Sequence, residues 1–314
     1  MLSNFTAGFS VVKPRPGDSS QRRRFALFVV IGLYLLSLQS CGGFPGAAEH
    51  PPAVERESKI PADAEKMSAT NDEHPTELLT GEYENPIPVP GKVNTAGGED
   101  SPFISEDGGT LYFFFTPDIQ IPADKQVLDG VTGIYVSRIF QGEWRKPERI
   151  FLQDADKLAM DGCAYIHGNR MWFCSAREGY EGLQWFTAEF QEGGWRNWQP
   201  VTFPPDFEVG ELHFSADGQE LYFASPRSGG KGQLDIWMSK NQGGAWQQPV
   251  NLASVNTDAS EGWPALNPAG DELWFSRNFG IWRSSKVNGE WQAPEQIVSN
   301  LAGEPSIDRE GNLY

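Results

Sequence analysis

The stretch Val209–Thr257 reads VGELHFSADGQELYFASPRSGGKGQLDIWMSKNQGGAWQQPVNLASVNT. It contains four short runs rich in aromatic and aliphatic residues, separated by segments of Gly, Asp, Asn and Ser. Runs of this length between such turn-forming residues are typical of β-strands. The stretch therefore predicts a four-stranded antiparallel meander, with strands over residues 211–215, 221–225, 235–239 and 246–255.

The same unit recurs along the chain. The glycine that forms the turn between the first and second strands returns at intervals of 60, 50, 52 and 41 residues. Its five copies are Gly108, Gly168, Gly218, Gly270 and Gly311. A period of roughly 40–50 residues with four strands in each copy is characteristic of β-propeller blades. We therefore expect an all-β chain that folds as a single propeller with five four-stranded blades.

The later strands of the unit recur as well. A Gly or Asp followed by Ile and an aromatic residue opens the third strand at residues 133–135, 235–237 and 280–282. A Gly-x-Trp sequence opens the fourth strand at residues 142–144, 244–246 and 289–291. At these residues the chain resembles the TolB-like β-propeller repeat family, over about residues 73–314. Because members of that family include periplasmic and surface lipoproteins, the resemblance implies an exported protein.

The two ends of the repeat region each supply an incomplete unit. Residues 81–89 match the fourth strand of a unit, with 77–80 as a poor third strand, while residues 304–314 supply only a first and a second strand. Joining the two ends would complete the fifth blade, close the ring and leave no open sheet edge. A prematurely ended gene would leave the same pattern.

The N-terminal region has the features of an export signal. Five basic residues precede Phe25–Leu38, an uncharged apolar run of 14 residues that is short for a membrane span and suits a secretory signal. The sequence Leu38-Gln-Ser-Cys41 then resembles a bacterial lipoprotein signal, with Cys41 as the lipidated residue. The alternative is an uncleaved N-terminal anchor. We expect a signal peptide over 1–40, a disordered tether over 41–72 and the propeller over 73–314, lipid-anchored in the bacterial cell envelope at the periplasmic face of the outer membrane or the cell surface.

Charge and motifs exclude several classes of function. The formal net charge of −17 makes nucleic acid an unlikely partner, because phosphate binding needs basic residues. The sequence contains no nucleophile elbow, zinc-protease motif, phosphate loop or Cys-x-x-Cys pair, and only His167 and His213 lie within the repeats. We therefore expect no metal and no cofactor, and we assign no catalytic residue.

Charged residues recur at related positions of the units, and we expect them to share one rim of the propeller. The acids, which precede or open first strands, are Glu99, Asp161, Glu211, Glu261 and Glu304, and the arginines, which follow second strands, are Arg177, Arg227 and Arg277. They could form a structural lattice of ion pairs, for example between Arg227 and Glu261. Alternatively they could form a rim that binds a protein, peptide or glycan, or a glycosidase site built on paired carboxylates. Acids repeated in every blade favour structure or binding over catalysis, and acids that are each paired with an Arg would argue against hydrolysis.

Two further features stand out within the units. Trp263 breaks the aromatic pattern of the repeats beside the acidic rim, so it is a candidate for ligand contact. The two-residue loop Gly168-Asn169 sets a hairpin register that places Cys163 opposite Cys174. In an oxidising compartment these two residues could form a disulfide, or they could simply fill a core position.

Overall fold

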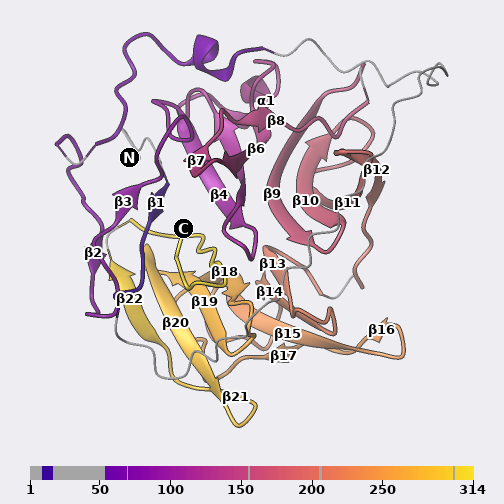
Figure 1. Ribbon diagram of the computed structural model, residues 1–314. Coiled ribbons are helices and arrows are strands. Elements are labelled where there is room, and N and C mark those ends of the chain that lie inside the picture. The colour runs from indigo at the N-terminus through magenta and orange to yellow at the C-terminus, as the bar shows by residue number, and fades with distance from the viewer. Residues whose placement is uncertain (1–8, 17–53, 69, 155, 205–206, 300) are drawn as a thin grey trace, which may run out of the picture.

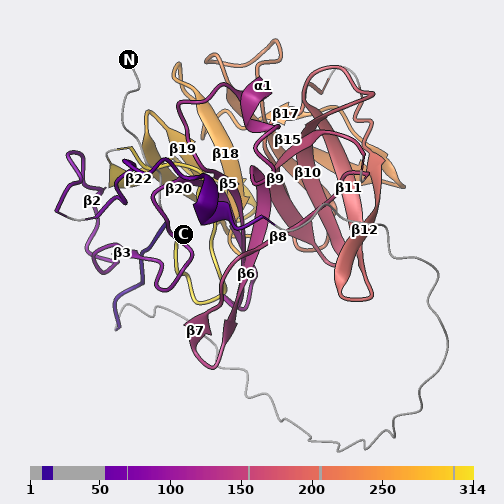
Figure 2. The ribbon, with the colours of Figure 1, turned by 90° about the horizontal axis from the view of Figure 1, so that it is seen from above.

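The computed structural model describes residues 9–16, 54–68, 70–154, 156–204, 207–299 and 301–314. Four antiparallel sheets are arranged around a central axis, as a β-propeller requires (Figure 1). The view from above in Figure 2 shows the same sheets standing side by side. The predicted all-β propeller arrangement is therefore confirmed, and four of the five predicted blades form complete sheets.

Each blade is a meander, and in three of the four blades the fourth strand is split into two pieces. Blade 1 contains β4 (Gly98–Ile104), β5 (Thr110–Thr116), β6 (Gly133–Phe140), β7 (Glu143–Trp144) and β8 (Glu148–Arg149). Blade 2 contains β9 (Ala159–His167), β10 (Arg170–Arg177), β11 (Gln184–Gln191) and β12 (Gly194–Pro200). Blade 3 contains β13 (Leu212–Phe214), β14 (Glu220–Ser225), β15 (Asp235–Gln242), β16 (Ala245–Trp246) and β17 (Val250–Asn251). Blade 4 contains β18 (Glu261–Leu266), β19 (Glu272–Arg277), β20 (Gly280–Val287), β21 (Glu290–Trp291) and β22 (Glu295–Ser299).

The first strand of each blade lies nearest the central axis. Figure 1 shows β4, β9, β13 and β18 around the centre, and neighbouring blades contact each other through these strands. All five turn glycines have φ between 61° and 80°, a left-handed conformation that glycine adopts without a steric penalty. The predicted turns therefore lie where the repeat places them, and they fix which side chains face the axis.

The space between blades is filled by the aromatic residues of the second strands. Tyr222 and Trp274 are fully inaccessible to solvent, and Tyr112 at the same repeat position is buried. Trp172, at that position in blade 2, is half-buried and stacks on Phe203 with 6.0 Å between ring centroids. Burial of these large rings between sheets is the main contribution to blade packing, because each removes a large apolar area from water.

The first and second strands of blades 1, 2 and 4 share a β-bulge. Their registers shift by an extra residue, and Ser101, Cys163 and Trp263 in these bulges have φ of 52°, 52° and 51°. The predicted hairpin register holds from His167–Arg170 to Tyr165–Trp172, but the bulge then pairs Cys174 with Gly162. The direct opposition of the two cysteines is therefore wrong by one residue. They are nevertheless joined by a disulfide, with 5.4 Å between their Cα atoms.

A fifth group of short segments lies between blade 4 and blade 1. Here β1 (Ser10–Val11) pairs with β3 (Ile87–Pro88), and isolated bridges connect Val12 with Leu313 and Leu313 with Ile307. We call residues 9–16, 81–89 and 303–314 the terminal assembly. The poor third strand expected at 77–80 is not part of it, because β2 (Glu77–Leu78) pairs with β22 at the outer edge of blade 4.

The N-terminal expectations are only partly open to examination. Cys41 and the apolar run Phe25–Leu38 lie outside the described residues. Within the part of the chain that is described, no helix is long and apolar enough to cross a membrane. The only helical segments described are a 3-10 turn at Arg56–Lys59 and α1 (Ala123–Gln126), which lies in the long connection between β5 and β6.

Candidate functional site

The acids predicted to share a rim divide into two sets, and the first set is buried and paired. Glu261 is fully buried, and its carboxylate accepts hydrogen bonds from Arg277 Nε at 2.6 Å and Thr257 Oγ1 at 2.6 Å. Asp161 accepts from Arg177 Nη2 at 2.7 Å and Ser175 Oγ at 2.6 Å. Glu261 therefore pairs with the arginine of its own blade, and the expected partnership with Arg227 is wrong. These carboxylates stabilise single blades.

Blade 1 has no arginine at the end of its second strand, and a distant residue takes that place. Arg56 is 2% exposed, and its Nη1 lies 3.3 Å from Glu99 Oε1. It also donates to the carbonyl oxygen of Val93, as Arg277 donates to that of Val255 at the same repeat position. Its guanidinium lies 4.8 Å from the Phe115 ring centroid, a stacking that Arg277 repeats on Trp282 at 4.4 Å.

Arg56 belongs to the segment 41–72, for which we expected a disordered tether. Its burial, together with the turn at Arg56–Lys59, shows that this part of the segment packs on the propeller. Nothing in the composition of the segment indicated this, because a single arginine in a polar stretch resembles any other. Burial also raises the pKa of Glu99 to about 7, against the opposing hydrogen bonds from Thr95 and the charge of Arg56.

Blade 3 has the arginine without the acid. Counting back nine residues from the turn glycine leads to Glu99 in blade 1 and Glu261 in blade 4, but to Val209 in blade 3. Arg227 stacks over Trp237 at 4.8 Å. Among the residues that the structure describes, its Nη1 atom is buried and has no hydrogen-bond partner.

The second set of acids lies near the axis and has no arginine partner among the described contacts. Counting back seven residues from four of the five turn glycines leads to Ser101, Glu211, Trp263 and Glu304, whereas in blade 2 the same count leads to Asp161 of the buried set. Glu304 has φ of 54°, like Ser101 and Trp263, and it accepts a hydrogen bond from Ser101 Oγ at 2.7 Å. Ser101 and Trp263 are the bulge residues of blades 1 and 4, and bulges commonly re-aim side chains.

Glu304, Glu211 and the neighbouring Asp100 form a group that we call the axial acids. The pKa of Glu304 is raised to about 8, first by burial and then by the charges of Asp100 and Glu211, while the Ser101 hydrogen bond opposes them. Burial also raises the pKa of Glu211. Glu304 therefore keeps its proton to a higher pH than an exposed carboxyl group does, because ionisation would place a buried charge near other carboxylates.

Two further side chains are related to the axial acids by their positions in the sequence. Trp263, at the same repeat position as Ser101, is 37% exposed. Among the residues that the structure describes, it is the one tryptophan in the group of exposed large apolar side chains. His213 lies on β13, two residues after Glu211, with its ring centroid 4.6 Å from that of Tyr165. Burial lowers the pKa of His213 to about 3, so the ring is neutral. Trp263 was predicted from the sequence as a site residue, whereas Ser101 was not. Counting back seven residues from the turn glycine of blade 1 would have found Ser101.

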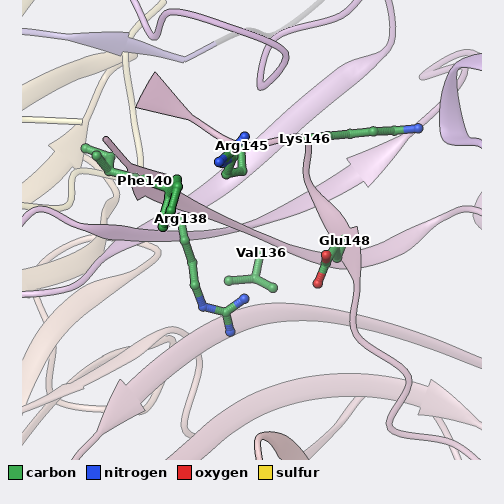
Figure 3. Close-up of a pocket in the computed structure, with 7 residues that line it drawn as sticks. Val136, Arg138, Phe140, Arg145, Lys146 and Glu148 are labelled. Atoms are coloured by element: carbon green, nitrogen blue, oxygen red, sulfur yellow. The ribbon is translucent and has the colours of Figure 1, made fainter. Parts of the chain in front are cut away.

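A pocket lies away from these acids, at the outer side of blade 1. It has a volume of about 330 Å³ and is lined by β6, β8 and the segment between β7 and β8, as Figure 3 shows. The side chains that line it include Val136, Arg138, Phe140, Arg145, Lys146 and Glu148. Arg145 stacks on Phe140 at 4.5 Å. Within the described residues no group of three or more His, Cys, Asp or Glu side chains has the geometry of a metal site.

Comparisons with known proteins add a general likeness of shape. No family model and no curated protein matches the chain. TolB from Acinetobacter baumannii is similar with 14% identity over 72% of this chain and 60% of its own length, at a TM-score of 0.39. The chain thus spans less than two thirds of that protein.

Solved structures of enzymes are similar to the same degree. An endo-arabinase from Bacteroides thetaiotaomicron matches with 14% identity over 68% of this chain and 87% of its own, at a TM-score of 0.41. A gluconolactonase from Xanthomonas campestris matches with 13% identity over 68% and 84%, also at 0.41. Similarity at this level does not distinguish binding from catalysis, and the propeller fold rests on the strand order described above.

Proposed function

We propose that the terminal assembly is a fifth blade that closes the ring. Residues 303–307 and Leu313 stand where first and second strands stand in the other blades, and Ile87–Pro88 stands where a fourth strand does. Contacts continue on to blade 1, because Ser306 Oγ accepts a hydrogen bond from the Ile104 amide at 3.0 Å. Closure of this kind removes the free edges that an open sheet would expose.

We further propose that the protein is an exported bacterial lipoprotein whose propeller is a non-catalytic binding module for a protein, peptide or glycan. The observation that carries this proposal is the division of the acids. Glu99, Asp161 and Glu261 have structural roles beside arginines, whereas the axial acids and the exposed Trp263 have no such role. Carboxylates without arginine partners, together with an accessible indole at a repeat position that Glu304 shares, suit a ligand with hydrogen-bond donors and an apolar or sugar face.

Binding is tested with glycan and peptide arrays probed by the full chain and by three variants. Trp263→Ala and Glu304→Gln should each weaken binding by at least about tenfold, the loss expected for one good contact of about 1.4 kcal/mol. Phe140→Ala, which alters the outer pocket of blade 1, is the matched control and should bind as the unaltered chain does. Equal binding by all four proteins would remove the axial site from consideration.

Anchoring is tested separately in bacteria. Cys41→Ser should abolish incorporation of labelled palmitate and either release the protein into the soluble fraction or leave an unprocessed precursor. Membrane partitioning and processing that do not change in this variant would contradict the lipoprotein assignment.

A glycosidase is the second candidate, and one observation favours it. Glu304 has a raised pKa beside other carboxylates, which is the condition of a general acid in glycoside hydrolysis. A panel of aryl glycosides and polysaccharides tests this candidate. Turnover by the full chain that Glu304→Gln abolishes would establish catalysis, and binding to glycans without turnover would support the binding module instead.

A further inference from the structure

Residues 9–15 occupy the place of a third strand in the proposed fifth blade. In blade 3 the side chain of Asn256 accepts a hydrogen bond from the amide of Ile236 at 2.9 Å and donates one to the carbonyl of Ile236 at 2.8 Å. Asn94, at the same position of its own Val-Asn-Thr sequence, makes the same two bonds with Phe9, at 2.9 and 2.8 Å. Phe9 is therefore the structural equivalent of Ile236, the second residue of a third strand.

The sequence of this segment fits that register. Gly8-Phe9-Ser10-Val11 aligns with Gly133-Ile134-Tyr135-Val136 of blade 1 and with Asp235-Ile236-Trp237-Met238 of blade 3. Phe9, Val11 and Val12 are buried, and the Phe9 ring lies 5.5 Å from that of Phe113. An N-terminal segment thus carries the apolar pattern that the repeat requires at this place.

The segment is held on both sides mainly by backbone hydrogen bonds. On one side Val12 and Leu313 exchange two bonds of 2.8 and 3.0 Å. On the other side the Val89 amide donates to the Phe9 carbonyl, the Glu84 amide to the Lys13 carbonyl, and the Arg15 amide to the Glu82 carbonyl. Backbone bonds do not depend on side-chain identity, so another extended segment with apolar residues at the positions of Phe9 and Val11 could replace this one.

Removal of this segment follows from the lipoprotein assignment, on which the inference rests. Processing at Cys41 would separate residues 9–15 from the propeller. The backbone groups of Leu313 on one side and of Glu84 and Val89 on the other would lose their partners, and the sites of Phe9 and Val11 would lose their apolar occupants. Unpaired backbone groups at a sheet edge favour pairing with another strand.

We propose that the groove between Leu313 and Ile87–Pro88 is a strand-acceptor site, which takes an extended segment of a partner protein after processing. Two apolar side chains in alternation would fill the places of Phe9 and Val11. A basic residue would follow them, since Arg15 lies against the acidic stretch Glu82–Glu84 and donates from Nε to the Tyr83 carbonyl at 2.9 Å. The residues of the N-terminal segment thus show what the partner strand should resemble.

The experiment uses the full chain with a specific protease site inserted within residues 42–50. After cleavage, an excess of a fluorescent peptide that copies residues 7–16 is added, and its anisotropy is measured. The cut chain should bind the peptide saturably, whereas the uncut chain, whose groove is filled by its own segment, should bind at least tenfold more weakly. A peptide with aspartate in place of both Phe9 and Val11 should not bind.

Two acceptor variants make the control pair. Asn94→Ala removes the clamp on Phe9 and should weaken peptide binding at least tenfold, whereas Asn256→Ala removes the same clamp within the continuous chain of blade 3 and should leave it unchanged. The proposal would be overturned if the folded, cut chain did not bind the peptide, or if it bound the aspartate peptide equally well. Dimerisation of the cut chain instead of peptide binding would also overturn it.

If the cut chain aggregates, the peptide should restore a soluble folded protein, and failure to do so also counts against the acceptor site. Because the added protease replaces natural processing, the result does not depend on lipidation of Cys41. Binding at the axial acids is measured with different variants, so the two proposals can fail independently.

Discussion

Glu261 opens β18 of blade 4 and Glu304 lies in the terminal assembly, nine and seven residues before their turn glycines, and the two acids lie in opposite environments. Glu261 is fully buried, with Arg277 and Thr257 bound to its oxygens. Glu304 has the Ser101 hydroxyl as its hydrogen-bond donor and faces the charges of Asp100 and Glu211. The two acids thus differ in what lies beside them, a buried cation for Glu261 and other carboxylates for Glu304.

This difference teaches that repetition alone does not identify a site. An acid that three of the four blades pair with an arginine is part of the repeat, and its ion pair contributes to folding. An acid at a position that other blades fill with Ser or Trp is free to vary without loss of the blade. The buried pairs and the axial acids should therefore respond differently to mutation.

The largest effect is expected for Arg277→Ala. Removing this guanidinium leaves Glu261 buried without its cation, which typically lowers the free energy of unfolding by about 3–5 kcal/mol. Urea denaturation of the variant measures the loss. Arg309→Ala is the control, because the Arg309–Glu106 pair is more than 60% exposed on both sides and contributes at most about 1 kcal/mol. Similar losses in the two variants would mean that Glu261 is not an essential partner of Arg277.

Arg56→Ala should have a smaller effect, of about 1–3 kcal/mol. Glu99 keeps its hydrogen bonds from Thr95, and its pKa of about 7 allows it to take up a proton once Arg56 is absent. The loss should therefore be larger at pH 8 than at pH 6. Arg56→Lys, which preserves the charge but not the stacked guanidinium, should recover part of the stability. An unchanged midpoint of unfolding would restore the view of this segment as a free tether.

Glu304→Gln should act in the opposite direction. The pKa of Glu304 is about 8 in the folded protein and lies near 4.5 when unfolded, so the folded state binds the extra proton between these values. Stability of the unaltered chain should therefore fall as pH rises through this window. The glutamine variant should lack that part of the pH dependence and be more stable at pH 8, by on the order of 1 kcal/mol. Parallel pH profiles for the two proteins would show that Glu304 ionises normally.

The smallest effect is expected for Arg227→Ala. Described contacts show no carboxylate beside this arginine, so its removal leaves no buried charge behind. The loss should be limited to the stacking on Trp237, which is less than about 1 kcal/mol. Thermal unfolding of Arg227→Ala and of Arg277→Ala, measured in parallel, compares how much two arginines at related positions of neighbouring blades contribute to stability. A loss as large as that of Arg277→Ala would reveal an acid partner for Arg227.

The sequence by itself determined the repeated meander. The turn glycines, the aromatic positions and the spacing of the units predicted five four-stranded units, of which four form complete sheets with the predicted strand order, because hydrophobic alternation and turn chemistry are local properties. It also predicted that Cys163 and Cys174 lie close together across a hairpin, although the bulge shifts their register by one residue. The run predicted as one strand over 246–255 forms two short pieces, since the twisted outer edge pairs only at β16 and β17.

Only the tertiary structure decided which charges pair and which strands the terminal segments supply. Arg56 reaches Glu99 from 43 residues away, and Phe9 reaches Asn94 from 85 residues away, so no periodicity connects them. Burial separates Glu261 from Glu304, because the cost of a charge depends on the atoms packed around it and not on its place in the sequence. A repeat specifies the blade, whereas the packing of distant segments determines how the blade is completed and which of its acids remain available.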